Sequence, residues 1–103
     1  MWAQLITMRL KPGKDEGLAK LLEQLSAIEQ PGSGLVRSLA MRDQNDPSRV
    51  YTLVVFESEE KARAREHDER RQQGLTAARA TMSDIFEGPP QFVDLTVVND
   101  FAP

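Results

Sequence analysis

The sequence contains no cysteine, and this absence excludes disulfide bonds, thiolate metal sites and cysteine nucleophiles. It also lacks any apolar segment near the ~20 residues that a membrane-spanning helix requires. Residues 1–10 have neither the basic start nor the long apolar run of a signal peptide. No phosphate-binding loop, zinc pattern or nucleophile with an adjacent base is present. We therefore expect a cytoplasmic protein with no membrane partner.

Length and charge narrow the class of protein further. A chain of 103 residues has the size of one domain, which we place at residues 1–98, with residues 99–103 as a C-terminal tail. Sixteen acidic and thirteen basic side chains give a formal charge of −3, and this balance argues against a nucleic-acid partner. Acidic pairs such as Asp43 and Asp46 have no metal-ligand spacing beyond that of a turn, so we expect no metal ion.

The segment from Val50 to Phe56 is the strongest strand signal in the chain. Six of its seven residues are β-branched or aromatic, as strands prefer. Apolar side chains occupy both alternating sets, since Val54 and Phe56 fall on one side and Leu53 and Val55 on the other. A strand that is apolar on both sides is expected to be covered on both sides.

Two periodicities organise the rest of the chain. A period of 3.6 residues from Lys14 to about Glu29 predicts an amphipathic helix. Alternation with a period of two residues, bounded by turn-forming residues, predicts strands. We expect four strands, at residues 1–10, 35–42, 50–56 and 92–98.

Residues 57–71 contain eleven charged side chains and no large apolar one, which predicts a solvated helix with Ser58 as its N-cap. Opposite charges fall at helical spacing, and each such pair stabilises a helix by about 0.2–0.5 kcal/mol. We expect Gly74 to interrupt this helix and residues 75–86 to form a separate apolar one. The expected ion pairs are Glu57 with Lys61, Glu59 with Arg63, Arg65 with Glu69, and Glu66 with Arg70.

The order strand, helix, strand, strand, helix in two pieces, strand predicts an α+β fold. With right-handed crossovers and a hairpin between the second and third strands, the simplest arrangement is a ferredoxin-like, four-stranded antiparallel sheet with the helices on one face. The central strands, residues 2–10 and 50–56, are apolar on both sides. Leaving about five large apolar groups in water would cost roughly 10 kcal/mol, against a total stability of about 5–15 kcal/mol. We therefore expect a homodimer through the open sheet face.

Three segments match the pattern of one known family. Residues 11–14, Lys-Pro-Gly-Lys, lead into the first helix, and residues 42–50 form the hairpin between the second and third strands. Residues 56–62, Phe-Glu-Ser-Glu-Glu-Lys-Ala, are similar to a Trp-Glu-Ser-x-Glu-x-Ala motif, with phenylalanine in place of tryptophan. In these segments the chain resembles the antibiotic-biosynthesis-monooxygenase (ABM) family of the dimeric α+β barrel superfamily.

The resemblance implies a ligand pocket between the sheet and the helices. The leading interpretation is a cofactor-independent monooxygenase or oxygenase that acts on an aromatic or quinol-like small molecule. One alternative is a non-catalytic dimer of the same fold that binds a small molecule or has a stress-related role. A second alternative is a haem-binding or haem-degrading protein, which would add haem as a cofactor.

Two residues are catalytic candidates. The resemblance places Thr52 where some monooxygenases have an asparagine. His67 is the only histidine, and its charge can change near neutral pH, so it could act as a base or as a haem ligand. The simpler interpretation of His67 is a solvated side chain between Glu66 and Asp68.

Large apolar residues are candidates to line the substrate pocket, although the same residues could form an ordinary core. Arg37 and Arg42 on the second strand could bind an anionic substrate or form salt bridges at the surface or at the dimer rim. The candidates for substrate binding are Trp2, Met8, Met41, Phe56, Met82 and Phe86.

Overall fold

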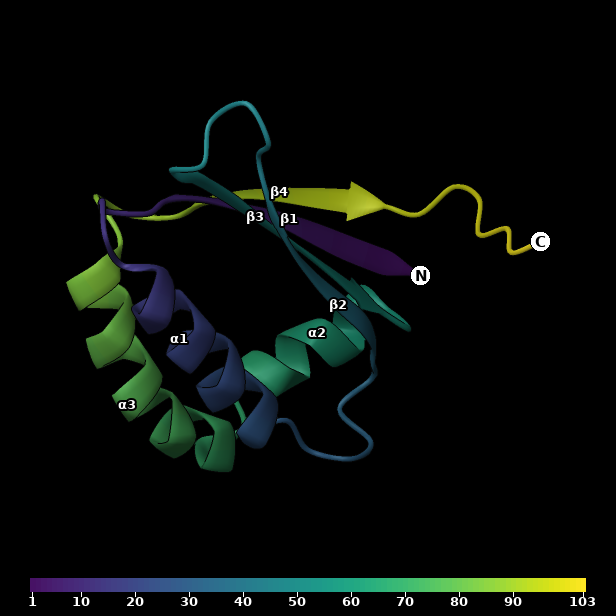
Figure 1. Ribbon diagram of the computed structural model, residues 1–103. Coiled ribbons are helices and arrows are strands. Elements are labelled where there is room, and N and C mark those ends of the chain that lie inside the picture. Colours follow the sequence, from purple (N-terminus) through teal and green to yellow (C-terminus); the bar gives the residue numbers. More distant parts are fainter.

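The computed structural model describes residues 1–103 and contains four strands and three helices, with the helices below the sheet in the view of Figure 1. The strands form one antiparallel sheet in the order β2-β3-β1-β4. The predicted ferredoxin-like α+β fold is therefore confirmed, with β1 and β3 as the central strands. The elements are β1 (Trp2–Arg9), α1 (Asp15–Ala27), β2 (Leu35–Arg42), β3 (Arg49–Phe56), α2 (Glu59–Glu66), α3 (Glu69–Ile85) and β4 (Gln91–Thr96).

Polar side chains fix where α2 and α3 begin. Ser58 is the N-cap of α2, and its hydroxyl accepts a hydrogen bond of 3.2 Å from the backbone N–H of Lys61. Asp68 caps α3 in the same way, accepting from the backbone N–H groups of Arg70 at 2.8 Å and Arg71 at 3.3 Å. The chain leaves the first of these helices at His67. The break in the helical segment therefore lies at residues 67–68.

The prediction that Gly74 interrupts this segment is wrong, because α3 continues through it from Glu69 to Ile85. A Cβ atom added to Gly74 would lie 2.5 Å from Cγ2 of Ile28, at the end of α1. Near the start of α1, a Cβ on Gly17 would lie 2.5 Å from Cγ2 of Ile85. The two glycines allow α1 and α3 to approach closely at both ends of their contact. Gly74 is therefore a packing residue.

The helix-facing side of the sheet carries the core in two separate clusters. In the first, residues of β1 and β3 pack against α1 and α3. In the second, the rings of Trp2 and Phe56 lie 6.0 Å apart under Ala62 of α2. The buried members of the first cluster are Leu10, Leu21, Val50, Ala78, Ile85 and Phe86.

The opposite side of the sheet carries no helix (Figure 1), and we call it the open face. Pairing registers place Leu39, Leu53, Leu5 and Val93 in one row across all four strands of this face. Leu39 is 41% exposed and Val93 is 49% exposed. An aliphatic row therefore crosses the open face in contact with water.

Beyond β4 the chain runs away from the sheet edge as an extended tail (Figure 1). Two apolar side chains of this tail have little packing, since Val98 is 93% exposed and Phe101 is 81% exposed. None of the helices combines the length and the apolar character that crossing a bilayer would require.

Candidate functional site

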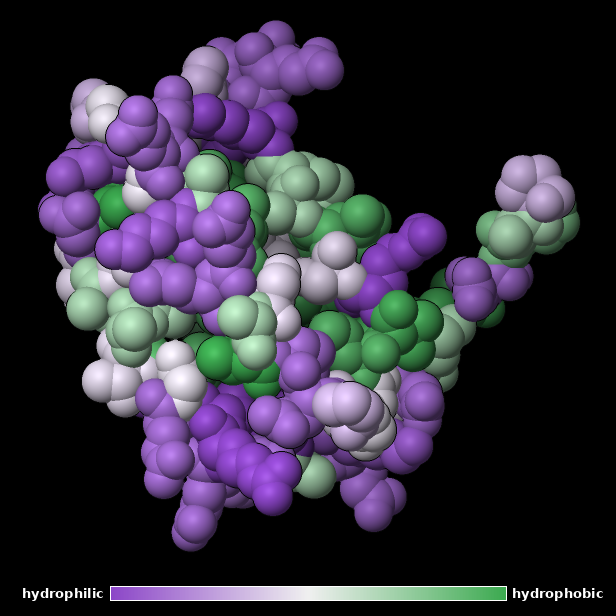
Figure 2. All heavy atoms as spheres, turned by 60° about the horizontal axis from the view of Figure 1, so that its bottom comes forward, coloured by the Kyte–Doolittle hydropathy of each residue, from purple (hydrophilic) through white to green (hydrophobic).

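Between the two core clusters, the helix-facing side of the sheet presents two further rows of side chains, which we call the middle rows. The helices do not fully cover them. Gln4, Ile6, Thr52 and Val54 are partly buried, and Phe92 is 58% exposed. Figure 2, which brings the helical layer forward, shows hydrophobic side chains emerging between the charged ones. In strand order, the registers give the rows Ser38, Val54, Gln4, Asp94 and Ala40, Thr52, Ile6, Phe92.

A hydrogen-bonded network of polar side chains runs along one of the middle rows. The Gln4 amide donates to Oδ1 of Asp94 at 2.9 Å, and the Arg63 guanidinium donates to Oδ2 of the same carboxylate at 3.0 Å. The hydrogen bond from Gln4, followed by that from Arg63, lowers the pKa of Asp94. The guanidinium of Arg63 also lies 5.0 Å from the centre of the Trp2 ring. An amide, a carboxylate and a cation therefore stand together at the edge of an apolar patch.

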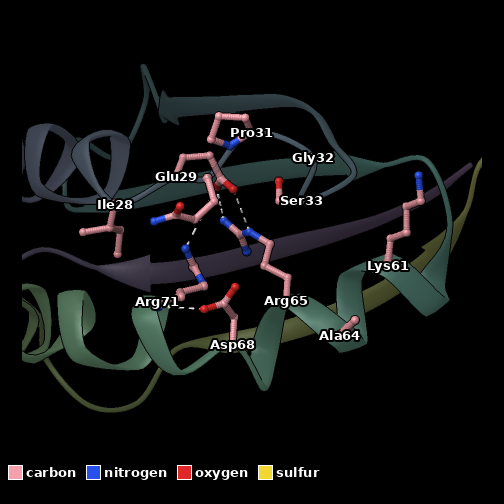
Figure 3. Close-up of a pocket in the computed structure, with 11 residues that line it drawn as sticks. Ile28, Glu29, Pro31, Gly32, Ser33, Lys61, Ala64, Arg65, Asp68 and Arg71 are labelled. Atoms are coloured by element: carbon pink, nitrogen blue, oxygen red, sulfur yellow. Dashed lines mark hydrogen bonds and ion pairs between the residues drawn. The ribbon is translucent and has the colours of Figure 1, made fainter.

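A second polar region lies where the α1–β2 loop meets α2 and α3. There a recess of about 200 Å³ is lined by residues 28–33 and by side chains of the two helices. Figure 3 shows the guanidinium groups of Arg65 and Arg71 pointing toward the carboxylate of Glu29. Arg65 donates two hydrogen bonds to this carboxylate. Nη1 of Arg71 lies 4.0 Å from Oε1 of Glu29, too far for a hydrogen bond.

Burial and charge act in opposite directions on these three groups. Burial alone would raise the pKa of Glu29, but hydrogen bonds from Arg65 and Ser33, together with the charge of Arg65, outweigh it and lower the pKa. Burial lowers the pKa of Arg71, and the charge of Arg65 lowers it further. The side chains of Arg65 and Arg71 are only 15% and 16% exposed. Two nearly buried cations therefore share one carboxylate.

The six predicted pocket residues fall into three places. Trp2 and Phe56 form the second core cluster, on one side of the middle rows. Met41 pairs with Tyr51 on the open face, where its side chain is 42% exposed. It therefore lies on the other side of the sheet from the rest. Three others lie in or against the first cluster, on the far side of the middle rows: Met8, Met82 and Phe86.

The two catalytic candidates lie apart. Thr52 stands in the middle rows between Ile6 and Ala40. His67 is exposed at the C-terminal end of α2 and is not among the residues that line the recess. Arg42 forms a 2.8 Å ion pair with Asp15 at the surface and also donates a 2.7 Å hydrogen bond to the backbone carbonyl of Pro47. The described chain contains no cluster of three or more potential metal-ligating side chains.

Sequence reasoning missed most of the polar residues in both regions. Gln4 alternates with Trp2 and Ile6, so the period of two already places it on the helix-facing side of the sheet. Asp94 was detectable in the same way once β1 and β4 were paired. Arg71 and Glu29 gave no local signal, because they meet only when α3 packs against α1.

The fold and the site define a class of protein: a ferredoxin-like α+β protein with one helix-covered face and one open apolar face. Within that class, the chain belongs to the antibiotic biosynthesis monooxygenase family, whose model matches residues 1–76. This agrees with the resemblance seen in the sequence. No curated protein matches the chain by sequence.

Solved structures share the fold at low sequence identity. A proposed antibiotic biosynthesis monooxygenase from Nitrosomonas europaea superposes with a TM-score of 0.75 at 18% identity, covering 96% of this chain and 100% of the other. One from Caulobacter crescentus gives 0.77 at 18% identity, covering 95% and 90%. A mutant of MhuD with two manganese protoporphyrin IX molecules bound per active site gives 0.81 at 16% identity, covering both chains fully. These matches establish the fold.

Proposed function

We propose that this chain is a cofactor-independent oxygenase that binds an aromatic or quinol-like molecule over the middle rows. One observation carries the proposal: Ile6, Val54 and Phe92 form an apolar patch that the helices leave accessible, with Gln4 and Thr52 beside it. An apolar wall with a few fixed polar groups is the usual composition of a small-molecule site. Membership of a monooxygenase family supports oxygen chemistry at this place.

In the proposed reaction the activated substrate itself reacts with O₂, without a bound cofactor. When one O₂ oxidises an activated methylene group to a carbonyl, one oxygen atom enters the product and the other leaves as water. Atoms and electrons then balance without an external reductant. The substrate must first lose a proton, which passes to solvent water, and the hydroxyl of Thr52 and the amide of Gln4 would hydrogen-bond its anionic oxygen. Asp94 is a poor base because its pKa is lowered, so we assign it to positioning Gln4 and Arg63.

We propose that the chain acts as a homodimer in which two open faces pack together. The aliphatic row of Leu39, Leu53, Leu5 and Val93 supports this arrangement, since it crosses the whole sheet without a covering layer. Monomeric proteins rarely leave so continuous an apolar surface in water. A second copy of the chain supplies a complementary apolar row by symmetry.

Binding and turnover test the oxygenase separately. Trp2 is the only tryptophan and lies beside the middle rows, so titration of its fluorescence with anthrones and quinols should reveal a ligand. Oxygen uptake with the same panel should then detect turnover. We expect Thr52→Val to lower kcat with little change in stability, whereas Ser83→Ala, at an exposed hydroxyl on α3, should leave kcat unchanged. Binding without any oxygen uptake would instead support the non-catalytic dimer, and no binding would contradict the proposal.

Haem binding is a separate outcome of the same work. The MhuD match motivates it, but the exposed position of His67 outside the middle rows does not favour it. Titration with hemin, followed through the Soret band, distinguishes the two functions. We expect no shift that depends on His67. A shift in the wild type that His67→Ala abolishes would replace the oxygenase proposal with haem binding.

A further inference from the structure

The recess between the α1–β2 loop, α2 and α3 contains a buried guanidinium nitrogen that lacks a hydrogen-bond partner. Arg65 satisfies the Glu29 carboxylate with two hydrogen bonds. Arg71 is left with Nη1 buried, 4.0 Å from that carboxylate and without any hydrogen-bond partner. A buried polar group without a partner is costly, and a charged one more so.

The other acidic group of the recess, Asp68, does not supply that partner. Its Oδ1 accepts from the backbone N–H groups at the start of α3, and its charge acts on Arg71 by raising the pKa of the guanidinium. Lys61 adds a further cation to the lining, although it is paired with Glu57 outside the recess. Glu29 is the carboxylate that lies within 4.0 Å of both guanidinium groups, and it leaves Nη1 of Arg71 without a hydrogen bond.

We propose that the recess is a binding site for a small oxyanion, of the phosphate or carboxylate type, held by Arg65 and Arg71. Guanidinium groups present several N–H donors in a plane, an arrangement that matches phosphate and carboxylate oxygens. The recess has room for such an ion, at about 200 Å³.

Glu29 has a definite role in this site. Its carboxylate occupies part of the hydrogen-bonding capacity of Arg65 and repels an incoming anion. Neutralising Glu29 should therefore strengthen anion binding, whereas removing the charge of Arg71 should weaken it. A recess whose residues serve only to hold the fold together would not respond to the two changes in opposite directions.

The test is isothermal titration calorimetry of this chain with inorganic phosphate. Sodium chloride holds the ionic strength constant during the titration, so that a change in the screening of surface charges does not contribute to the signal. We expect saturable binding to the wild type. Arg71→Gln should weaken it by about tenfold or more, as expected when one charged hydrogen-bonding partner is lost. Glu29→Gln should tighten it. Sulfate and acetate, titrated in parallel, distinguish a site for tetrahedral anions from one for carboxylates.

Arg70→Gln is the matched control, because Arg70 is the neighbouring residue on α3, is exposed, and carries the same charge. It should bind phosphate as the wild type does. If Arg71→Gln fails to fold, Glu29→Gln against the wild type still decides the question. The proposal is overturned if the wild type shows no saturable binding of any of the three anions. It is also overturned if Glu29→Gln does not bind more tightly, or if Arg70→Gln weakens binding as much as Arg71→Gln.

Discussion

Replacing Leu39 by aspartate tests the packing of two open faces most directly. The side chain of Leu39 is 41% exposed in the single chain, so the substitution should change the stability of the protomer little. In a dimer the same side chain becomes buried. Burying a whole leucine side chain contributes about 1.5–3 kcal/mol. Burying the exposed part of Leu39 in both copies therefore contributes roughly 1–2.5 kcal/mol to the dimer. Each aspartate also loses hydration without gaining a partner, which adds several kcal/mol.

We therefore expect Leu39→Asp to weaken the dimer by about 3 kcal/mol or more, or at least about a hundredfold in dissociation constant. Sedimentation equilibrium over a concentration series measures this change. Leu22→Asp is the matched control, since Leu22 is 37% exposed on α1 and lies away from the open face. The control should remain at twice 11.6 kDa. A wild-type protein of 11.6 kDa at micromolar concentration, or a Leu39→Asp variant as tightly dimeric as the control, would refute the reasoning.

Changes at Gly74, Asp68 and Glu29 test other parts of the structure. Gly74→Ala should destabilise the protein by about 1–3 kcal/mol in urea unfolding through overpacking against Cγ2 of Ile28, despite a gain of about 1 kcal/mol in helix propensity. Ile28→Ala, which removes Cγ2, should cost less stability in the Gly74→Ala background than in the wild type. Asp68→Ala should cost about 0.5–2 kcal/mol in urea unfolding, because α3 loses its N-cap. The lowered pKa of Glu29 means that its ionised form stabilises the fold above its ordinary value of 4.5 and loses this effect as the pH falls through the folded value. Unfolding midpoints measured below about pH 5 should therefore fall more steeply for the wild type than for Glu29→Gln.

The sheet was predictable because a strand leaves a short-range pattern. The alternation of Val54 and Phe56 against Leu53 and Val55 already implies two apolar faces, and the crossover rules then place β1 and β3 in the centre. The Ser58 cap was predictable for the same reason, since its partner lies three residues away. Features that depend on neighbours in the chain could be derived from the chain alone.

Features that depend on packing between helices could not. The predicted pairs of Glu57 with Lys61 and Glu59 with Arg63 are confirmed, because both lie before the break. Glu57 directly precedes the N-cap Ser58, and the other three residues belong to α2. The predicted pair of Arg65 with Glu69 is wrong. The break at residues 67–68 separates the two residues, and Arg65 instead reaches Glu29 on another element.

The prediction for Glu66 is wrong for the same reason. Its expected partner, Arg70, lies beyond the break in α3, and Glu66 pairs with Arg63 one turn earlier. Gly74 belongs to this group of errors, since only the approach of α1 distinguishes a packing glycine from one that breaks a helix.

The attachment of α2 follows from its composition. The only buried residue of this helix is Ala62, which is too small to hold a helix of eight residues on a sheet by apolar contact alone. Two arginines provide additional contact, because the aliphatic part of an arginine side chain can lie along an apolar surface while its guanidinium group stays in polar surroundings. The guanidinium of Arg63 lies 5.0 Å from the centre of the Trp2 ring, and that of Arg65 lies 5.1 Å from the centre of the Phe56 ring.

The guanidinium groups of Arg63 and Arg65 explain why the polar region beside the middle rows and the recess both adjoin α2. Arg63 continues to Asp94 beside the middle rows, and Arg65 continues to Glu29 in the recess. A helix anchored by leucines would have no charge to place at either position. The charge-rich sequence of α2 is therefore more than a solvated surface, because the side chains that hold the helix on its two aromatic rings also supply a cation to each candidate site.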